Sequence, residues 1–196
     1  MNNPLTHIKL PRLSLSLEKT LIANITDKNL SYNKNTSCDD EKNAIQNKDL
    51  ETLNKLDYVK QLYGIDYIPQ HKMNNVEFKL IRRIESELGI KLPRTAKVYV
   101  QTIDSEFSFI HTDGLRKNSF FYLLSDNGDC ETRFYTSENL PVYSRIWNPN
   151  EVKQFYSHKI LPHNWYMFSH DTIHSVNNVD GLRITLIVDM SEEYPV

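Results

Sequence analysis

The sequence predicts a mainly β fold, either an all-β barrel or a two-sheet sandwich, that carries flanking α-helices. Two observations support this prediction. From Ala96 onward, short segments in which apolar and polar residues alternate follow one another at regular spacing, with turn residues between them. The segments with helical periodicity lie before Ala96. Many short strands preceded by helices are typical of such barrels and sandwiches.

We expect residues 1–95 to form a supporting region of strand and helix, and residues 96–196 to form the core, within one structural domain. Residues 13–17 alternate strictly, which favours a strand, and residues 17–25 are expected to continue as a short helix. Residues 27–48 are rich in Asn, Lys, Asp and Ser, so we expect a loop or a mobile segment there.

Two helices are expected after this polar segment. Apolar residues recur every three positions from Leu50 to Leu62, and they recur at helical spacing from Leu80 to Leu88. The first helix is expected to start at Asp49 and to stop at Gly64. For the second, Asn74 or Asn75 is the expected N-cap, and Gly89 is the expected residue after the C-terminus. Both helices are expected to pack on the outside of a sheet.

The core is expected to contain about eight strands. They are placed at residues 97–103, 107–111, 120–124, 131–135, 142–147, 152–156, 165–168 and 182–188. The turn at residues 125–129 has Asn127-Gly128 at its centre, which is typical of a β-hairpin. A second hairpin is expected to turn at residues 148–150.

Composition and charge exclude several classes of function. The formal net charge is −2 and the pI is about 6.4, so there is no basic surface to predict a nucleic-acid partner. No apolar run approaches the roughly 18 residues of a membrane span, and the N-terminus lacks the apolar segment of a signal peptide. With two cysteines and no CxxC motif, a disulfide framework is not expected, and we predict a cytoplasmic protein.

Three side chains of the core predict a metal site. His111 and Asp113 are two residues apart, so in an extended strand they point to the same side, and His174 follows later in the chain. Two imidazoles and one carboxylate can hold one face of a ferrous ion and leave the other face open. These donors also suit manganese or zinc, but a closed zinc site would need a fourth protein ligand, and no cysteine is near the three in sequence.

Arg183 and Thr185 predict a receptor for a carboxylate. They share one face of an apolar strand, opposite Ile184 and Leu186. An inward-facing arginine is costly unless it meets an anion, and its planar fork matches a carboxylate with two hydrogen bonds. A metal and a buried carboxylate receptor in one barrel are what a 2-oxo dicarboxylate requires.

Residues 97–190 resemble the core of the Fe(II)- and 2-oxoglutarate-dependent oxygenases, whose signature is HxD…H…RxT. The prolyl-4-hydroxylase-like branch is the most similar. The matching stretches are Phe121-Tyr122-Leu123-Leu124, the segment 127–134 with its Glu131-Thr132-Arg133-Phe134 element, His174-Ser175-Val176 and Gly181-Leu182-Arg183. This resemblance implies a double-stranded β-helix core, of the jelly-roll or cupin-like type.

The resemblance also implies roles for individual residues. His111, Asp113 and His174 would bind Fe(II), while Arg183 would bind the distal carboxylate of 2-oxoglutarate with help from Thr185. The first core strand departs from the Tyr-x-x-Gly pattern of the branch. Either Gln101 replaces that tyrosine, or Tyr99 reaches in. By the same resemblance, Tyr122 would also contact the distal carboxylate of 2-oxoglutarate.

The activity that the resemblance implies is a hydroxylation. With O2, 2-oxoglutarate is converted to succinate and CO2 while an unactivated C–H bond of a small molecule, or of an amino-acid or peptidyl side chain, is hydroxylated. The presence of Asp113 favours hydroxylation over halogenation. Two alternatives stay open: a non-catalytic sensor that binds metal and 2-oxoglutarate, and a cupin-type protein that binds metal alone.

Several residues are candidate substrate contacts. Arg116 and Lys117 follow the metal-binding strand and are expected to border the mouth of the site. Arg133 and Arg145 either face inward to bind an acidic substrate or face solvent. Trp147 either lines the substrate side or caps the core. Dimerisation through the N-terminal helices is left open, and neither a membrane nor a nucleic acid is expected as a partner.

Overall fold

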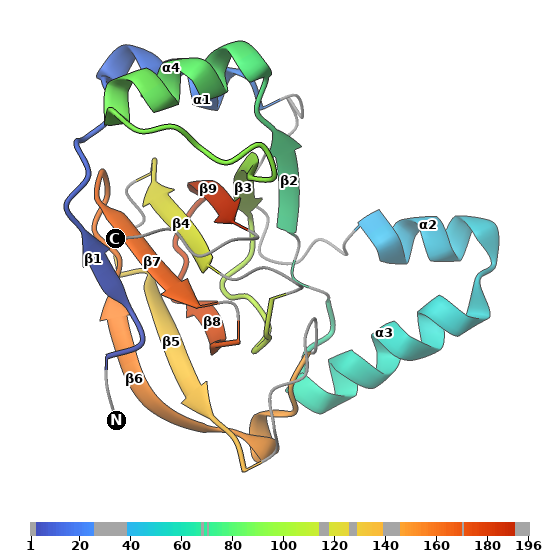
Figure 1. Cartoon of the computed structure of the whole chain (residues 1–196). Coiled ribbons are helices and arrows are strands. Elements are labelled where there is room, and N and C mark those ends of the chain that lie inside the picture. Colours follow the sequence, from blue (N-terminus) through green and yellow to red (C-terminus); the bar gives the residue numbers. More distant parts are fainter. Residues whose placement is uncertain are drawn as a thin grey trace.

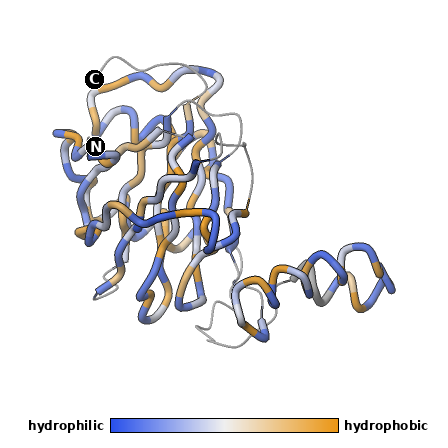
Figure 2. Tube along the Cα trace, turned by 90° about the horizontal axis from the view of Figure 1, so that it is seen from below, coloured by the Kyte–Doolittle hydropathy of each residue, from blue (hydrophilic) through white to orange (hydrophobic). Residues whose placement is uncertain are grey.

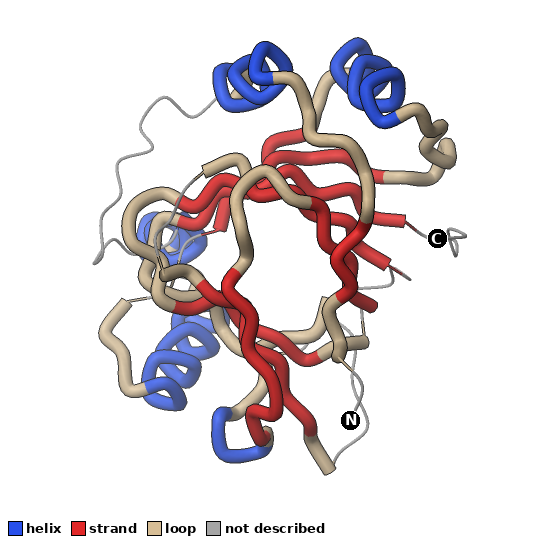
Figure 3. Tube along the Cα trace, turned by 90° about the vertical axis from the view of Figure 1, so that its left-hand side faces the viewer, coloured by secondary structure: helices blue, strands red, loops and turns tan. Residues whose placement is uncertain are grey.

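The structure is a computed structural model of the chain. It describes residues 3–25, 39–67, 69, 71–113, 118–125, 129–138, 146–169 and 171–190. Within these ranges the strands form two antiparallel sheets, and Figure 3 shows them arranged as a ring with the helices outside it. The mainly β fold with flanking helices that the sequence predicts is therefore confirmed.

The larger sheet has the strand order β1-β7-β4-β9-β3-β2, and the smaller sheet has the order β6-β5-β8. The strands of the larger sheet are β1 (Thr6–Ile8), β2 (His71–Asn75), β3 (Lys97–Ile103), β4 (Asn118–Leu123), β7 (Trp165–Ser169) and β9 (Arg183–Met190). Those of the smaller sheet are β5 (Glu131–Thr136), β6 (Lys153–Lys159) and β8 (Ile173–Asn177).

The connections identify the core as a double-stranded β-helix. The order β7-β4-β9-β3 in the larger sheet faces the order β6-β5-β8 in the smaller one, and the segment that ends at His111 lies beside β8 through a β-bridge to His174. The chain therefore passes from one sheet to the other along most of its core, which is the winding of a jelly roll. This arrangement brings β9 and β8 to opposite walls of one interior.

Two helices cover the outer face of the larger sheet, α1 (Leu15–Ala23) and α4 (Phe78–Leu88) (Figure 1). Leu17 of α1 and Ile84 of α4 are fully buried and pack in one cluster with Val100 of β3 and Leu186 of β9. As predicted, Gly89 ends α4 with a left-handed backbone, but the N-cap is Glu77, because Asn74 and Asn75 belong to β2.

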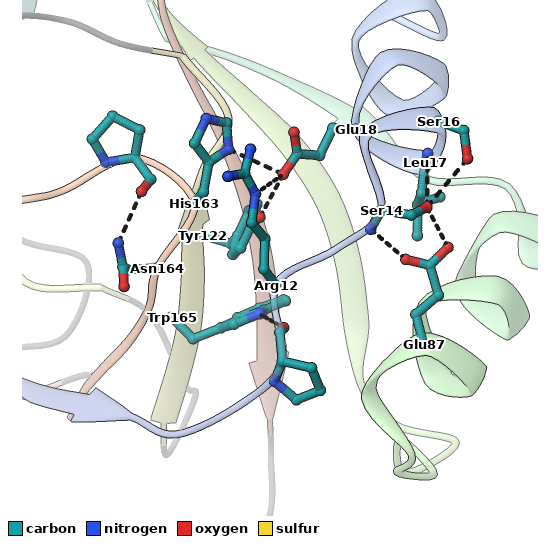
Figure 4. Close-up of polar contacts among 12 residues, drawn as sticks. Arg12, Ser14, Ser16, Leu17, Glu18, Glu87, Tyr122, His163, Asn164 and Trp165 are labelled. Atoms are coloured by element: carbon teal, nitrogen blue, oxygen red, sulfur yellow. Dashed lines mark hydrogen bonds and ion pairs between the residues drawn. The ribbon is translucent and has the colours of Figure 1, made fainter.

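The strand expected at residues 13–17 is wrong, because α1 begins there. Ser14 caps the helix by accepting a hydrogen bond from the Leu17 backbone N–H, and it also binds Glu87 of α4 through its own N–H and hydroxyl (Figure 4). Leu13, Leu17 and Leu21 then recur every four residues and are all buried. The alternation of leucines matched a strand, but the cap and the contact with α4 select the helix.

A second pair of helices, α2 (Asp39–Asn47) and α3 (Leu50–Tyr63), lies to one side of the sheets (Figures 1 and 2). The prediction of α3 is confirmed, with Asp49 as N-cap and Gly64 as the left-handed residue after its end. Residues 39–47 are helical and not the loop that their composition suggested, while residues 27–38 of that polar segment lie outside the described residues.

The core strands differ from the predictions in three places. Residues 107–110 are irregular, β8 was not predicted, and β6 extends to Lys159 and pairs with β5. The turn at 148–150 is a 3₁₀ helix, η1 (Pro149–Glu151), while residues 142–145 of the expected hairpin, and Asn127-Gly128, lie outside the described residues. In the described part of the chain, no helix has the length and apolar character needed to cross a lipid bilayer.

Candidate metal centre

The structure brings the three predicted metal donors together. One ligand atom of each of His111, Asp113 and His174 can be chosen so that all three lie within 4.8 Å of one another. A pair of backbone hydrogen bonds holds the two histidines side by side, since each N–H donates to the other residue's carbonyl at 2.9 Å. The ring centroids are 4.4 Å apart as a result.

Each histidine uses one ring nitrogen for the protein and leaves the other for a ligand. Nδ1 of His111 lies 2.8 Å from the carbonyl oxygen of Phe109, and Nδ1 of His174 lies 2.9 Å from that of Thr172. A carbonyl only accepts, so in the neutral form of each ring Nδ1 carries the proton and Nε2 presents a lone pair. This arrangement fixes the ring orientation that metal-binding histidines require.

The His174 ring is neutral at neutral pH. Its pKa is lowered to about 4, chiefly by burial and then by the nearby His111, while Asp113 acts in the opposite direction. A neutral imidazole is the form that binds a metal. Nε2 of His111 lies 3.7 Å from Oδ1 of Asp113, so a second imidazole and a carboxylate oxygen face the same point.

The three donors open into a cavity of about 210 Å³ between the sheets. Side chains of β2, β3 and β9 line one wall, and His174, Val176 and Thr132 of the smaller sheet line the other. Tyr99 and Gln101 are two residues apart on β3 and both line the cavity. Both residues named for the first core strand therefore line the cavity, and the choice between them stays a prediction.

Arg183 and Thr185 face the same cavity from β9, as their spacing predicts. Ile184 and Leu186 point the other way into the cluster under α1 and α4. Arg183 is 4% exposed, and its burial lowers its pKa. Within the described residues, neither Nε of Arg183 nor Oγ1 of Thr185 has a hydrogen-bond partner. Buried polar atoms without partners are rare, and here they face a space in which a ligand can lie.

The expectation for Tyr122 is corrected, because its side chain points away from the cavity. Tyr122 is fully buried on the outer face of the larger sheet, where its hydroxyl donates to Oε1 of Glu18 on α1 (Figure 4). His163 also approaches that carboxylate, with Nδ1 at 3.0 Å. The neighbouring residues Ser119 and Phe121 of β4 line the cavity instead.

The two candidate substrate contacts that the structure describes, Arg133 and Trp147, do not line the cavity. Arg133 points to the opposite side of β5 from Thr132 and binds Glu131, with Nε and Oε1 2.6 Å apart. Trp147 is fully buried in a cluster with Ile110 and Ile173, so it belongs to the core. Arg116, Lys117 and Arg145 lie outside the described residues.

Sequence reasoning missed one polar residue of the cavity in particular, His71 of β2. It stands in the polar stretch His71-Lys72-Met73-Asn74-Asn75, which shows no apolar alternation and so gives no signal of a strand. Met73, two residues further on, also lines the cavity and is 55% exposed, which places it at the opening.

No family model matches the chain, and no curated protein matches it in sequence. Among solved structures, it is similar to a prolyl-4-hydroxylase from Pseudomonas putida, at 11% identity over 97% of this chain and 94% of that one, with a TM-score of 0.44. It is also similar to a prolyl hydroxylase from Trichoplax adhaerens, in complex with a hypoxia inducible factor oxygen degradation domain peptide fragment, at 14% identity over 95% and 83%, with a TM-score of 0.45.

A third similar structure is EvdO2 from Micromonospora carbonacea var. aurantiaca, at 12% identity over 66% of this chain and 70% of that one, with a TM-score of 0.37. Similarities this distant carry no functional assignment. We therefore base the proposed function on the residues of this chain.

Proposed function

We propose that this chain is an Fe(II)- and 2-oxoglutarate-dependent dioxygenase. It would hydroxylate an unactivated C–H bond of a small molecule, or of an amino-acid or peptidyl side chain. One observation carries the proposal: three metal donors and two polar side chains with unpartnered buried atoms, Arg183 and Thr185, open into the same cavity.

The donor set fits ferrous iron. His111, Asp113 and His174 supply two neutral imidazole nitrogens and one carboxylate oxygen, the combination found where iron keeps open positions for a co-substrate and oxygen. No fourth His, Cys, Asp or Glu of the described residues joins this group, which argues against a closed structural zinc site. When bound, the iron would supply the oxygen activation that the protein's own side chains cannot.

The residues of the chain would hold and enclose the co-substrate. Arg183 offers a guanidinium fork and Thr185 a hydroxyl, which suit the carboxylate of 2-oxoglutarate that lies far from the metal. Phe121, Phe168 and Ile187 give the cavity apolar walls. Such walls exclude water and strengthen each charge interaction inside the site.

Anaerobic titration tests the proposal. The protein is loaded with Fe(II), 2-oxoglutarate is added, and the visible metal-to-ligand absorption band of the chelate is followed. We expect the band in the wild type. In Asp113→Ala both metal binding and the band should be lost. In Arg183→Ala the band should appear only at a much higher concentration of 2-oxoglutarate. Arg133→Ala is the matched control, because that arginine lies outside the cavity and should leave the titration unchanged.

Other outcomes assign a different function. If Fe(II) binds and 2-oxoglutarate gives no band, Arg183 is not a co-substrate receptor and the chain is a metal-binding protein of the cupin type. If the band forms and no succinate is produced under oxygen, even without added substrate, the chain binds both ligands without turnover. Succinate formation that requires both Asp113 and Arg183 supports the dioxygenase.

A further inference from the structure

His71 faces the same cavity as the metal donors and Arg183. In the larger sheet, His71 of β2 is the partner of Ile103 on β3, and Ile103 is the partner of Arg183 on β9. Directly paired residues of antiparallel strands point to the same face, and all three line the cavity. His71 and Arg183 are two strands apart, about 10 Å between backbones, so their side chains can converge on one small ligand.

The Nε2 atom of His71 lacks a hydrogen-bond partner among the described residues, as do atoms of Arg183 and Thr185. It is buried, and no hydrogen-bond partner for it exists in the part of the chain that the structure describes. Nε of Arg183 and Oγ1 of Thr185 share this condition. Because native proteins pair almost all buried polar groups, three such atoms around one cavity mark where a polar ligand would bind.

The surroundings of His71 connect it to both ends of the proposed co-substrate. The pKa of His71 is lowered to about 3, chiefly by burial and then by the charges of His111, Arg183 and His174. These include two metal donors and the carboxylate receptor. Because all four residues line one cavity, a molecule that reaches from the metal to Arg183 can lie beside His71, whose neutral ring can donate a hydrogen bond without adding charge.

We propose that His71 is a third anchor for the co-substrate, donating a hydrogen bond from Nε2 to the 2-oxo acid where it extends from the metal centre toward Arg183. This proposal rests on the proposed function, since it assigns a residue of the same site. It makes His71 a binding residue for 2-oxoglutarate, distinct from the three metal donors.

Calorimetric titration of metal-loaded protein tests this role without turnover. Mn(II)-loaded wild type and variants are titrated with 2-oxoglutarate. We expect His71→Leu to weaken 2-oxoglutarate binding about tenfold, the effect of one lost hydrogen bond. His71→Gln, whose amide nitrogen reaches a similar position, should recover most of the affinity, and Mn(II) affinity should stay unchanged in both variants.

The control is His158→Leu, because His158 lies on β6, is partly buried and does not line the cavity. It should bind 2-oxoglutarate as the wild type does. Equal 2-oxoglutarate affinity in wild type and His71→Leu, or loss of Mn(II) binding in His71→Leu, overturns the role of His71 and leaves the proposed function standing. Failure of the wild type to bind 2-oxoglutarate overturns the proposed function itself.

A measurement on the unaltered protein covers the case in which His71→Leu does not fold. Histidine-labelled, Zn(II)-loaded protein is followed by ¹H–¹⁵N NMR as 2-oxoglutarate is added. The Nε2–H signal of His71, assigned by its absence in His71→Gln, should move downfield and become protected from exchange with solvent. An unmoved signal at saturating 2-oxoglutarate overturns the proposal.

Discussion

At the scale of single residues, the site depends on histidines that stay neutral. His174 and His71 both have depressed pKa values, of about 4 and about 3, and in both cases burial is the largest cause. The residues have different tasks in the proposed site, since His174 would bind the metal through Nε2 and His71 would donate from it. A neutral imidazole can do either, whereas the protonated ring can only donate.

These two pKa values predict how the metal-free protein responds to acid. In the unfolded chain both histidines take up a proton near pH 6.5, whereas in the folded chain they resist it until about pH 4 or below. The unfolded state therefore binds more protons in this window, and the free energy of unfolding falls as the pH falls through it. Above pH 6.5 this contribution is fully present.

We expect a loss on the order of 2 kcal/mol for each histidine across the window. Urea unfolding of the metal-free protein at several pH values measures it. The curve for His71→Gln should be flatter than that of the wild type between pH 6.5 and 4. Parallel curves for the wild type and the variant would show that folding does not lower the pKa of His71.

Residue spacing predicted part of the site and missed the rest for a physical reason. Arg183 and Thr185 were placed correctly because β9 has polar residues on one face between apolar ones, so its alternation is unambiguous. In β4 the residues from Ser119 to Leu123 are all buried, on both faces of the sheet. Alternation then carries no information on which face is inside. The contact of Tyr122 with the carboxylate was implied by the family resemblance alone, and alternation could not correct it, although Phe121 is the residue that lines the cavity.

At the scale of elements, the Tyr63 hydroxyl of α3 forms hydrogen bonds with the segment that leads to the metal site. Tyr63, the last residue of α3, accepts a hydrogen bond from the backbone N–H of Ile110 at 3.1 Å and donates one to the carbonyl of Trp147 at 2.6 Å. Ile110 directly precedes His111. Burial raises the pKa of Tyr63 to about 12, so its hydroxyl keeps the proton that it donates.

Tyr63→Phe should therefore loosen the metal site without touching it. The variant removes the hydrogen bonds of the hydroxyl to the Ile110 N–H and the Trp147 carbonyl, and the loss costs about 1–3 kcal/mol of stability. Because the Ile110 backbone positions His111, Fe(II) affinity should fall while 2-oxoglutarate affinity at saturating metal stays close to that of the wild type.

Metal titration and thermal unfolding of Tyr63→Phe measure these effects. Tyr58→Phe is the matched control, because Tyr58 lies on the same helix and is 62% exposed. It should change neither quantity. Unaltered Fe(II) affinity in Tyr63→Phe, with stability reduced, would restrict Tyr63 to a structural role.

Elements were predicted well where one periodicity dominates and poorly where tertiary contacts decide. The helix over Leu50–Tyr63 and the strand over Lys97–Ile103 follow their patterns almost to the residue. In α1, by contrast, the leucines satisfy two periods, and the bonds between Ser14 and Glu87 of a distant helix select one. β8 was missed because Ile173–Asn177 is a short strand with buried polar residues, His174 and Ser175, in place of an apolar run.

At the scale of the whole molecule, the cavity lowers the stability of the ligand-free fold, and a bound ligand should restore it. Its unpartnered buried atoms destabilise the ligand-free chain, since each such group costs about 1–3 kcal/mol. Binding of metal and 2-oxoglutarate should stabilise the fold by about 2.7 kcal/mol at a hundredfold excess over Kd. The protein would therefore gain stability and function from the same contacts.

Thr185→Val separates the effect of the unpartnered hydroxyl on stability from its effect on ligand binding. It removes an unpartnered hydroxyl and keeps the shape of the side chain, so the ligand-free variant should be as stable as the wild type or more stable, by up to about 2 kcal/mol. The rise in Tm on adding 2-oxoglutarate to the metal-loaded protein should be smaller in the variant. Differential scanning calorimetry with and without the ligand measures both, and a less stable ligand-free variant would contradict the expectation.

The N-terminal elements form both edges of the larger sheet, which limits where this chain can be cut. β1 closes one edge against β7, β2 closes the other against β3, and α1 and α4 cover the outer face, yet all four lie before residue 96. Residues 96–196 therefore rely on the N-terminal strands and helices to close and cover the larger sheet. A fragment of residues 96–196 would expose two bare strand edges and an apolar face, which favour self-association. We expect it to aggregate in light scattering where the whole chain does not, so changes that reshape the site must leave the N-terminal strands in place.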